Sequence, residues 1–152
     1  MRFVPVAADV SPARELMAAM VEEIAELYGG DLATDPRSPS ATPRDLAPPG
    51  GTCLVGYEGE AAVCVGAVKR LDADTGELKR MYVVPAARGR GVARALLDAL
   101  EDAARGLGYA RTRLDTGAAQ PHALALYESA GYRSIADYNG NPYASWWGER
   151  AL

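Results

Sequence analysis

A turn rich in glycine and arginine has the features of a phosphate-binding site. It runs from Arg88 to Ala93 and reads RGRGVA. The first N–H groups of a helix lack intrahelical partners, and the helix dipole adds positive charge there, so an anion is favoured. Glycines also let the backbone approach a ligand closely. The turn therefore predicts binding of an anion such as a phosphate, with added positive charge from Arg88, Arg90 and Arg94. The alternative is a flexible turn with solvated arginines.

Two common phosphate loops do not fit this turn. No Gly-Lys-Ser/Thr follows at the spacing of a P-loop. The dinucleotide-binding fingerprint needs three spaced glycines near an early strand and an acidic residue about 20 positions later, and the chain lacks that arrangement. The anion must be bound by another kind of turn.

A predicted strand and a strongly amphipathic helix flank the turn. The strand runs from Glu77 to Val84 and is ended by Pro85. The helix has apolar residues at helical spacing, namely Val92, Leu96, Leu97, Leu100, Ala103, Ala104 and Leu107. A strand at 111–116 and a helix at 121–130 follow. These elements would hold the turn and the residues near it in place.

The first third of the chain predicts a short strand, a helix and a long irregular segment. The strand covers residues 3–7, Ser11 resembles a helix N-cap, and Pro12 suits the first helical position. Residues 29–51 are rich in proline and glycine, and a short helix is expected at 42–46. A loop of this length in a compact domain is usually functional or disordered.

Two strands, 52–57 and 61–71, form a predicted hairpin. With Glu58-Gly59 as its turn, Cys53 falls opposite Cys64. Together with final strands at 132–135 and 145–149, the element order is β-α-(α)-β-β-β-α-β-α-β-β. Antiparallel hairpins followed by βαβ crossovers predict an α+β domain with a mixed sheet and helices on both faces.

Composition and charge narrow the class of protein. The 152 residues fit a single domain, 1–152, with 49% hydrophobic and 24% charged side chains. The net charge of −4 argues against sequence-independent nucleic-acid binding. No apolar run reaches the ~20 residues of a membrane span, and no signal peptide is evident, so we expect a cytoplasmic protein. Two cysteines and one histidine are too few for a structural zinc site, and no metal is expected.

Two segments resemble the GNAT superfamily of N-acetyltransferases. Arg88-x-x-Gly91-x-Ala93, after a strand reading LKRMYVVP, resembles the acetyl-CoA signature of that family. Residues 125–132, ALYESAGY, resemble its A-x-x-L-Y-x-x-x-G-F segment, with Tyr132 in place of the usual Phe. The specific motifs lie between residues 77 and 135, and the element order agrees along nearly the whole chain.

The resemblance implies a fold and a donor. We expect a mostly antiparallel sheet of about six or seven strands flanked by about four helices. In the family, the strand before the turn splays from the next, and the pantetheine of acetyl-CoA lies in the resulting cleft. Carried over to this chain, the cosubstrate-binding residues are Met81, Tyr82, Val83, Arg88, Gly89, Arg90, Gly91, Val92 and Ala93.

The resemblance also implies catalytic residues. Tyr127 matches the tyrosine that the family often uses as general acid, and a core packing role is the alternative. Glu77 matches a glutamate that some members use as base, often through water, whereas the alternative is an exposed carboxylate at a strand end. His122 is the only histidine, but near a helix start we expect a surface or capping role.

The acceptor is less determined by the sequence. The resemblance places acceptor selection at residues 28–49 and 138–147, and an acidic rim could suit a cationic amine. That rim would consist of Glu22, Glu23, Glu26 and Asp31, and a solvated helix face explains these residues equally well. We expect acetyl transfer to a primary amine of a small or amino-acid-like molecule. A protein or peptide N-acetyltransferase and a non-catalytic CoA-binding module are the alternatives. Trp146-Trp147 suits either a homodimer interface or a contact within the chain.

Overall fold

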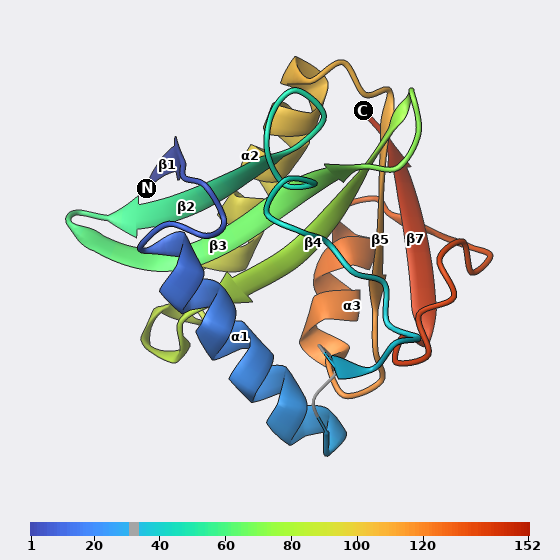
Figure 1. Ribbon diagram of the computed structural model, residues 1–152, viewed down its shortest axis with the longest axis horizontal. Coiled ribbons are helices and arrows are strands. Elements are labelled where there is room, and N and C mark those ends of the chain that lie inside the picture. Colours follow the sequence, from blue (N-terminus) through green and yellow to red (C-terminus); the bar gives the residue numbers. More distant parts are fainter. Residues whose placement is uncertain (31–33) are drawn as a thin grey trace.

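The centre of the molecule is a seven-stranded sheet. The computed structural model describes residues 1–30 and 34–152, and the strand order is β1-β2-β3-β4-β5-β7-β6 (Figure 1). The strands are β1 (Arg2–Pro5), β2 (Thr52–Glu58), β3 (Ala61–Arg70), β4 (Thr75–Val83), β5 (Arg111–Thr116), β6 (Arg133–Ile135) and β7 (Trp146–Ala151). Among the strands of the described residues, only β4 and β5 pair in parallel, and the other neighbours are antiparallel. The predicted α+β fold with a mixed, mostly antiparallel sheet is confirmed.

Helices cover both faces of this sheet. In the view of Figure 1, α1 (Ala13–Tyr28) lies in front, and α2 (Val92–Gly106) and α3 (Pro121–Ser129) lie behind. Each side has its own apolar core, one formed with α1 and the other with α2 and α3. The described residues include a short 3-10 helix at Pro85–Ala87 that the sequence did not predict. Residues 43–46 form turns rather than the expected helix. No described helix is long and apolar enough to cross a membrane.

Strands β4 and β5 separate after a short parallel ladder. Their pairing covers only Thr75–Glu77 against Arg111–Arg113. Beyond it, β4 continues to Val83, while β5 remains paired with β7 through Thr116 (Figure 1). In the part of the chain that the structure describes, the backbone of β4 after Glu77 therefore has no strand partner on its β5 side, as expected from the splayed strands of the family.

A bulge interrupts β4 at the splay. Val65 of β3 faces Tyr82 and Ala67 faces Lys79, so that Arg80 and Met81 share one position of the partner strand. Arg80 has φ of +58°, in the left-handed region that few non-glycine residues adopt. A bulge breaks the alternation of side chains. Met81 packs with the α2–α3 core, while Arg80 reaches the segment after α1.

The β2–β3 hairpin differs in register from the prediction. Glu58 faces Ala61, so the turn residues are Gly59 and Glu60, and Gly59 has φ of +57°. A tight hairpin needs positive φ at its first turn position, which explains why glycine occupies it. The register of the hairpin also shifts between Gly56 and Tyr57, before the turn. The predicted juxtaposition of the cysteines is therefore wrong: Cys64 faces Gly56, and Cys53 faces Ala67.

The start of α1 also differs from the prediction. The helix begins at Ala13, with Pro12 at the N-cap position and no side-chain cap. The hydroxyl of Ser11 instead donates to the Glu15 carboxylate at 2.6 Å. Ser11 is therefore not the N-cap, because its hydroxyl bonds the Glu15 carboxylate instead of a backbone N–H group.

The C-terminal tryptophans make contacts within the chain. Trp146 packs against the core under α2 and α3. The indole N–H of Trp147 donates to Asn139 Oδ1 at 2.9 Å. Both side chains thus have intramolecular roles, and the homodimer remains a prediction.

Candidate functional site

A large cavity lies at the N-terminal end of α2, between that helix, α3 and the end of β4. Its volume is about 690 Å³. It is lined by Met81, Tyr82, Val83, Arg88, Gly89, Gly91, Val92, Ala93, Arg94, Leu96, His122, Ala123, Leu126 and Tyr127. We call it the donor cavity. It brings together every residue predicted to hold the cosubstrate except Arg90.

The turn at this cavity is shaped by its glycines. Gly89 and Gly91 have φ of +80° and +81°, and Gly91 is the N-cap of α2 without a side-chain cap. A Cβ atom at either glycine would meet no atom within 4 Å. The backbone conformation, rather than lack of space, therefore requires glycine. The N–H groups of the first turn of α2 have no intrahelical acceptor and border the cavity.

Each arginine near the turn has a carboxylate partner. The pairs are Arg88–Glu23, Arg90–Glu58 and Arg94–Asp98, with N–O distances of 2.9, 2.9 and 3.1 Å. Arg88 also donates to the Val83 carbonyl at 2.9 Å and so ties the turn to β4. These exposed pairs offset much of the positive charge. The backbone amides and the dipole of α2 remain as the main attraction for an anion.

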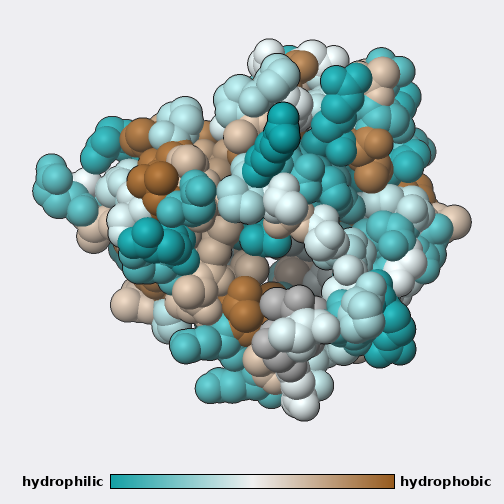
Figure 2. Space-filling view, viewed as in Figure 1, coloured by the Kyte–Doolittle hydropathy of each residue, from teal (hydrophilic) through white to brown (hydrophobic). Residues whose placement is uncertain are grey.

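A second, smaller cavity lies on the α1 side of the splay. Its volume is about 210 Å³, and Figure 2 shows the surface hollowed in this region. The lining comes from α1, β4, β5, α3 and three connecting segments: Met20, Ile24, Tyr28, Pro39, Glu77, Leu78, Lys79, Arg80, Met81, Asp115, Thr116, Gly117, Gln120, Tyr127, Asn141 and Tyr143. We call it the acceptor cavity. Met81 and Tyr127 line both cavities, so the two meet there.

Tyr127 lies on α3 at this junction. The residue is only 8% exposed and its ring packs edge-to-face with Tyr132 at 6.1 Å. Its hydroxyl donates to Met81 Sδ at 3.7 Å. Burial, with a smaller effect from the negative charge of Asp115, raises the pKa of Tyr127 to about 12. The phenol therefore keeps its proton at neutral pH.

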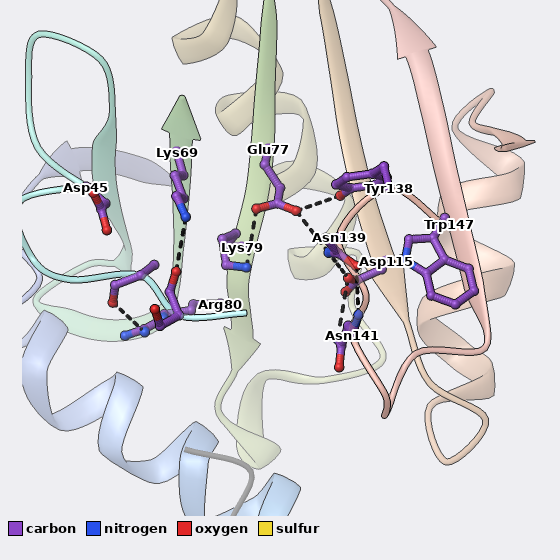
Figure 3. Close-up of polar contacts among 12 residues, drawn as sticks. Asp45, Lys69, Glu77, Lys79, Arg80, Asp115, Tyr138, Asn139, Asn141 and Trp147 are labelled. Carbon is purple, nitrogen blue, oxygen red and sulfur yellow. Dashed lines mark hydrogen bonds and ion pairs between the residues drawn. The ribbon is translucent and has the colours of Figure 1, made fainter. Parts of the chain in front are cut away.

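Glu77 is a buried carboxylate rather than an exposed one at a strand end. It is 4% exposed and lines the acceptor cavity. Its Oε2 accepts from Tyr138 Oη at 2.7 Å and from Asn139 Nδ2 at 3.3 Å, and its Oε1 lies 3.3 Å from Lys79 Nζ (Figure 3). Burial and the adjacent carboxylate raise the pKa of Tyr138, which keeps that donor protonated.

Asn139 joins Glu77 to a second carboxylate. Its Nδ2 donates to Asp115 Oδ2 at 2.6 Å as well as to Glu77 (Figure 3). The indole N–H of Trp147 donates to Asn139 Oδ1, which fixes the orientation of the amide because an indole N–H can only donate. Asn141 Nδ2 adds a longer bond of 3.4 Å to Asp115. The sequence pointed to the segment 138–147 but gave no sign of Asp115.

Aromatic residues form one wall of the acceptor cavity. Tyr28 at the end of α1 packs edge-to-face with Tyr143, with ring centroids 6.0 Å apart, and donates to Gln120 Oε1 at 3.1 Å. Gly117 allows this arrangement, because a Cβ there would collide with the Tyr28 hydroxyl. Parts of both segments expected to select the acceptor therefore line one cavity.

The described members of the expected acidic rim do not line this cavity. Glu22 and Glu26 are exposed on the outer face of α1, and Glu23 pairs with Arg88. The fourth residue of that rim, Asp31, lies outside the described residues. His122 is exposed at the start of α3 and lines the donor cavity instead. Within residues 1–30 and 34–152, no group of three or more His, Cys, Asp or Glu side chains could hold a metal ion.

Comparison with known proteins identifies the family. Residues 14–132 match the family model described as the Acetyltransferase (GNAT) family. The chain belongs to the GNAT family of acetyltransferases. As a member of this family, the protein is an acyltransferase enzyme.

Individual GNAT relatives agree in sequence and in fold. The chain is 34% identical over 123 residues to an IAA acetyltransferase of Azospirillum brasilense, covering 80% of each chain. It is 39% identical over 121 residues to the N-alpha-acetyltransferase RimI of Mycobacterium tuberculosis, covering 73% of this chain and 68% of the relative. A solved structure of a putative acyl-CoA N-acyltransferase from Klebsiella pneumoniae superimposes with a TM-score of 0.76 at 28% identity, covering 99% and 97% of the two chains.

Proposed function

We propose that this GNAT enzyme transfers the acetyl group of acetyl-CoA to the primary amine of a small, amino-acid-like molecule by direct attack. The observation that carries the proposal is the junction of the two cavities at Met81 and Tyr127. A thioester held at this junction would be open to an amine from the acceptor side. The donor would enter from the side of the glycine turn.

The donor cavity suits a large cosubstrate with a pyrophosphate. Its volume of about 690 Å³ lies within the range of about 300–1,000 Å³ typical of ligand pockets. The backbone amides from Gly89 to Ala93 would bind the pyrophosphate. The unpaired edge of β4 at Met81–Val83 offers main-chain groups for the amide groups of pantetheine. Bound there, acetyl-CoA would supply an activated acyl group.

Tyr127 would act on the departing sulfur. In the transfer, a C–N bond forms and the C–S bond breaks, so negative charge develops on sulfur. The pKa of Tyr127, about 12, is well above that of an ordinary thiol, about 8.5. Complete proton transfer to the thiolate would therefore be uphill. Tyr127 would stabilise the thiolate chiefly by donating a hydrogen bond.

Glu77 would receive the proton that the amine loses. It faces the acceptor cavity, and its position is held by Tyr138, Asn139 and Lys79. These donors occupy much of its hydrogen-bonding capacity. Proton removal through a bound water therefore fits the geometry better than direct contact with the amine.

The size of the acceptor cavity favours a small molecule. At about 210 Å³, it is smaller than the roughly 300 Å³ at the lower end of common ligand pockets. The second candidate acceptor is the N-terminus of a peptide. It is favoured by the 39% identity to a relative named as an N-alpha-acetyltransferase.

A direct test measures CoA release from acetyl-CoA with a panel of small amines and of short peptides. Tyr127→Phe serves as the variant control. We expect turnover with at least one small amine and loss of most of it in the variant. If the protein binds acetyl-CoA tightly but releases no CoA with any amine, the proposal is refuted. Turnover of peptides alone would favour the second candidate.

A further inference from the structure

Charged groups in the acceptor cavity are separated by sign. The carboxylates of Glu77 and Asp115 lie on the side of β5, joined by Asn139. Lys79 and Arg80 lie toward the segment that follows α1, on the other side of Glu77 (Figure 3). All four charged residues line the cavity. The cavity therefore has an acidic end at Glu77 and Asp115 and a basic end at Arg80, and Lys79 lies between them in an ion pair with Glu77.

The bulge in β4 creates the basic end. In a regular strand, Lys79 and Arg80 would point to opposite faces. Because the bulge breaks that alternation, Lys79 bonds Glu77 while Arg80 bonds the Ala41 carbonyl, and both remain on the cavity wall. A non-glycine residue with positive φ is costly and often marks a functional site.

Among the described residues, Arg80 has a partner for only part of its hydrogen-bonding capacity. Its Nη2 donates to the Ala41 carbonyl at 2.7 Å, and no carboxylate of the described residues forms an ion pair with it. A guanidinium has five N–H donors, and burial lowers the pKa of this one. Lys69 beside it likewise donates to a carbonyl, that of Ser40 at 3.0 Å. Burying a cation whose described partners are only neutral oxygens costs free energy unless an anion also binds to it.

We propose that the acceptor is a zwitterion, a small amine that also carries a carboxylate. Arg80 binds the carboxylate, with Lys79 beside it, while the amine lies toward Glu77 and Asp115, near Tyr127. This rests on the proposed function and specifies its substrate class. A planar guanidinium can bind a carboxylate through two parallel hydrogen bonds, which fixes orientation as well as position. Arg80 thus selects the acceptor and does not take part in the chemical step.

This arrangement discriminates between classes of amine. A polyamine would place a second cation against Arg80, and like charges in a small cavity are repelled. An amino-acid amide or a peptide N-terminus would present a neutral carbonyl group where the carboxylate belongs. Each should therefore be a poorer acceptor than the corresponding amino acid.

The test compares α-, β- and γ-amino acids, each paired with its own carboxamide, as acceptors in the CoA-release assay. We expect the best amino acid to exceed its amide in kcat/KM by about 10- to 100-fold, the usual effect of one hydrogen bond to a charged group. Arg80→Met should reduce this ratio to near 1, mainly through KM. Arg80→Lys should retain part of it.

The control variant is Arg105→Met. Arg105 lies near the C-terminal end of α2 in an exposed pair with Asp102, so the same change of charge occurs far from both cavities. We expect it to leave the ratio of acid to amide unchanged. Acetyl-CoA affinity, measured by calorimetry, should be unaffected in both Arg80 variants, which shows that they remain folded and able to bind the donor.

A binding measurement covers the case in which no amine is turned over. That result would refute the proposed function, but the carboxylate site can still be tested by titrating N-acetylated amino acids and their amides into the CoA complex. Preference for the acids in the wild type, lost in Arg80→Met, supports the inference. Equal or better use of the amides, or a preference that survives Arg80→Met, overturns it.

Discussion

The two cavities that meet at Tyr127 are built in different ways. The donor cavity offers an anion the backbone of one continuous turn, 88–93, whose arginines pair with acids of the protein itself. The acceptor cavity offers side chains from strands and loops that are distant in sequence, and Glu77 and Tyr138 are 61 positions apart. Main-chain recognition depends on conformation, whereas side-chain recognition depends on residue identity. Changes of side chain should therefore affect the acceptor far more than the donor, except where they disturb the backbone of the turn.

The largest expected effect comes from disturbing the donor turn itself. Gly91→Glu should weaken acetyl-CoA binding by more than about 100-fold, because juxtaposed like charges cost several kcal/mol. The left-handed backbone adds about 1–2 kcal/mol of strain. Calorimetry measures the affinity.

Gly59→Glu is the matched control for this variant. Gly59 also has positive φ and no atom within 4 Å of an added Cβ, but it lies in the β2–β3 hairpin turn. It should show similar strain and normal affinity. Normal affinity in Gly91→Glu would mean that the pyrophosphate lies elsewhere.

Tyr127→Phe tests the junction of the two cavities. We expect kcat to fall by about 100-fold, the lower end of the effect of removing one hydrogen-bond donor from a developing anion. The affinity for acetyl-CoA should stay within about 2-fold, because the lost hydroxyl acts mainly when sulfur departs.

Tyr132→Phe gives the contrasting result. Tyr132 Oη shares hydrogen bonds with Thr112 and Glu101 in the core, at 2.7 and 2.8 Å. Its loss should lower the free energy of unfolding by about 1–3 kcal/mol with little change in kcat. If both tyrosine variants lose stability and activity alike, Tyr127 has a packing role only.

Asn139→Ala tests whether a residue of the loop before β7 organises the acceptor side. The change removes the shared donor of Glu77 and Asp115 and the acceptor of Trp147. We expect kcat/KM for the amine to fall by about 10-fold, the effect of one hydrogen bond to a charged group. Acetyl-CoA affinity should not change. A loss confined to acetyl-CoA binding would contradict the separation of the two cavities.

Arg90→Met should have the smallest effect. Arg90 is exposed, pairs with Glu58 and is absent from the lining of the donor cavity. Exposed ion pairs contribute only about 0–1 kcal/mol, so the dissociation constant of acetyl-CoA should change by less than about 3-fold. A 30-fold loss would show that arginine side chains, rather than amides, hold the phosphates, since about 1.4 kcal/mol corresponds to each factor of ten.

The sequence was informative where a local pattern sets the structure. The amphipathic pattern of residues 92–107 predicted α2, and the motifs at 88–93 and 125–132 together indicated the family and its fold. The register of the hairpin was missed because it depends on which residue of the Glu58–Glu60 segment takes positive φ, and a bulge shifts it further. A pattern with period two does not reveal such a shift.

The acceptor side was predictable only as a region. Asp115 and Asn139 meet through the tertiary packing of β5 and the loop before β7, 24 positions apart. The basic end arises from the bulge at Arg80. A regular alternation of side chains along β4 would have placed Lys79 and Arg80 on opposite faces of the sheet. Such juxtapositions have no local signal. For Glu22, Glu23 and Glu26, the alternative of a solvated helix face agrees with the structure, and a charge pattern alone does not distinguish it from a rim of the site.

A crystal structure of the protein with CoA bound tests the contrast between the two cavities most directly. We predict that the pyrophosphate lies on the backbone amides of 89–93, that pantetheine follows the free edge of β4, and that the thiol ends beside Tyr127 at the opening of the acceptor cavity. Phosphates held by the side chains of Arg88 and Arg90 away from these amides, or a thiol remote from Tyr127, would contradict the account.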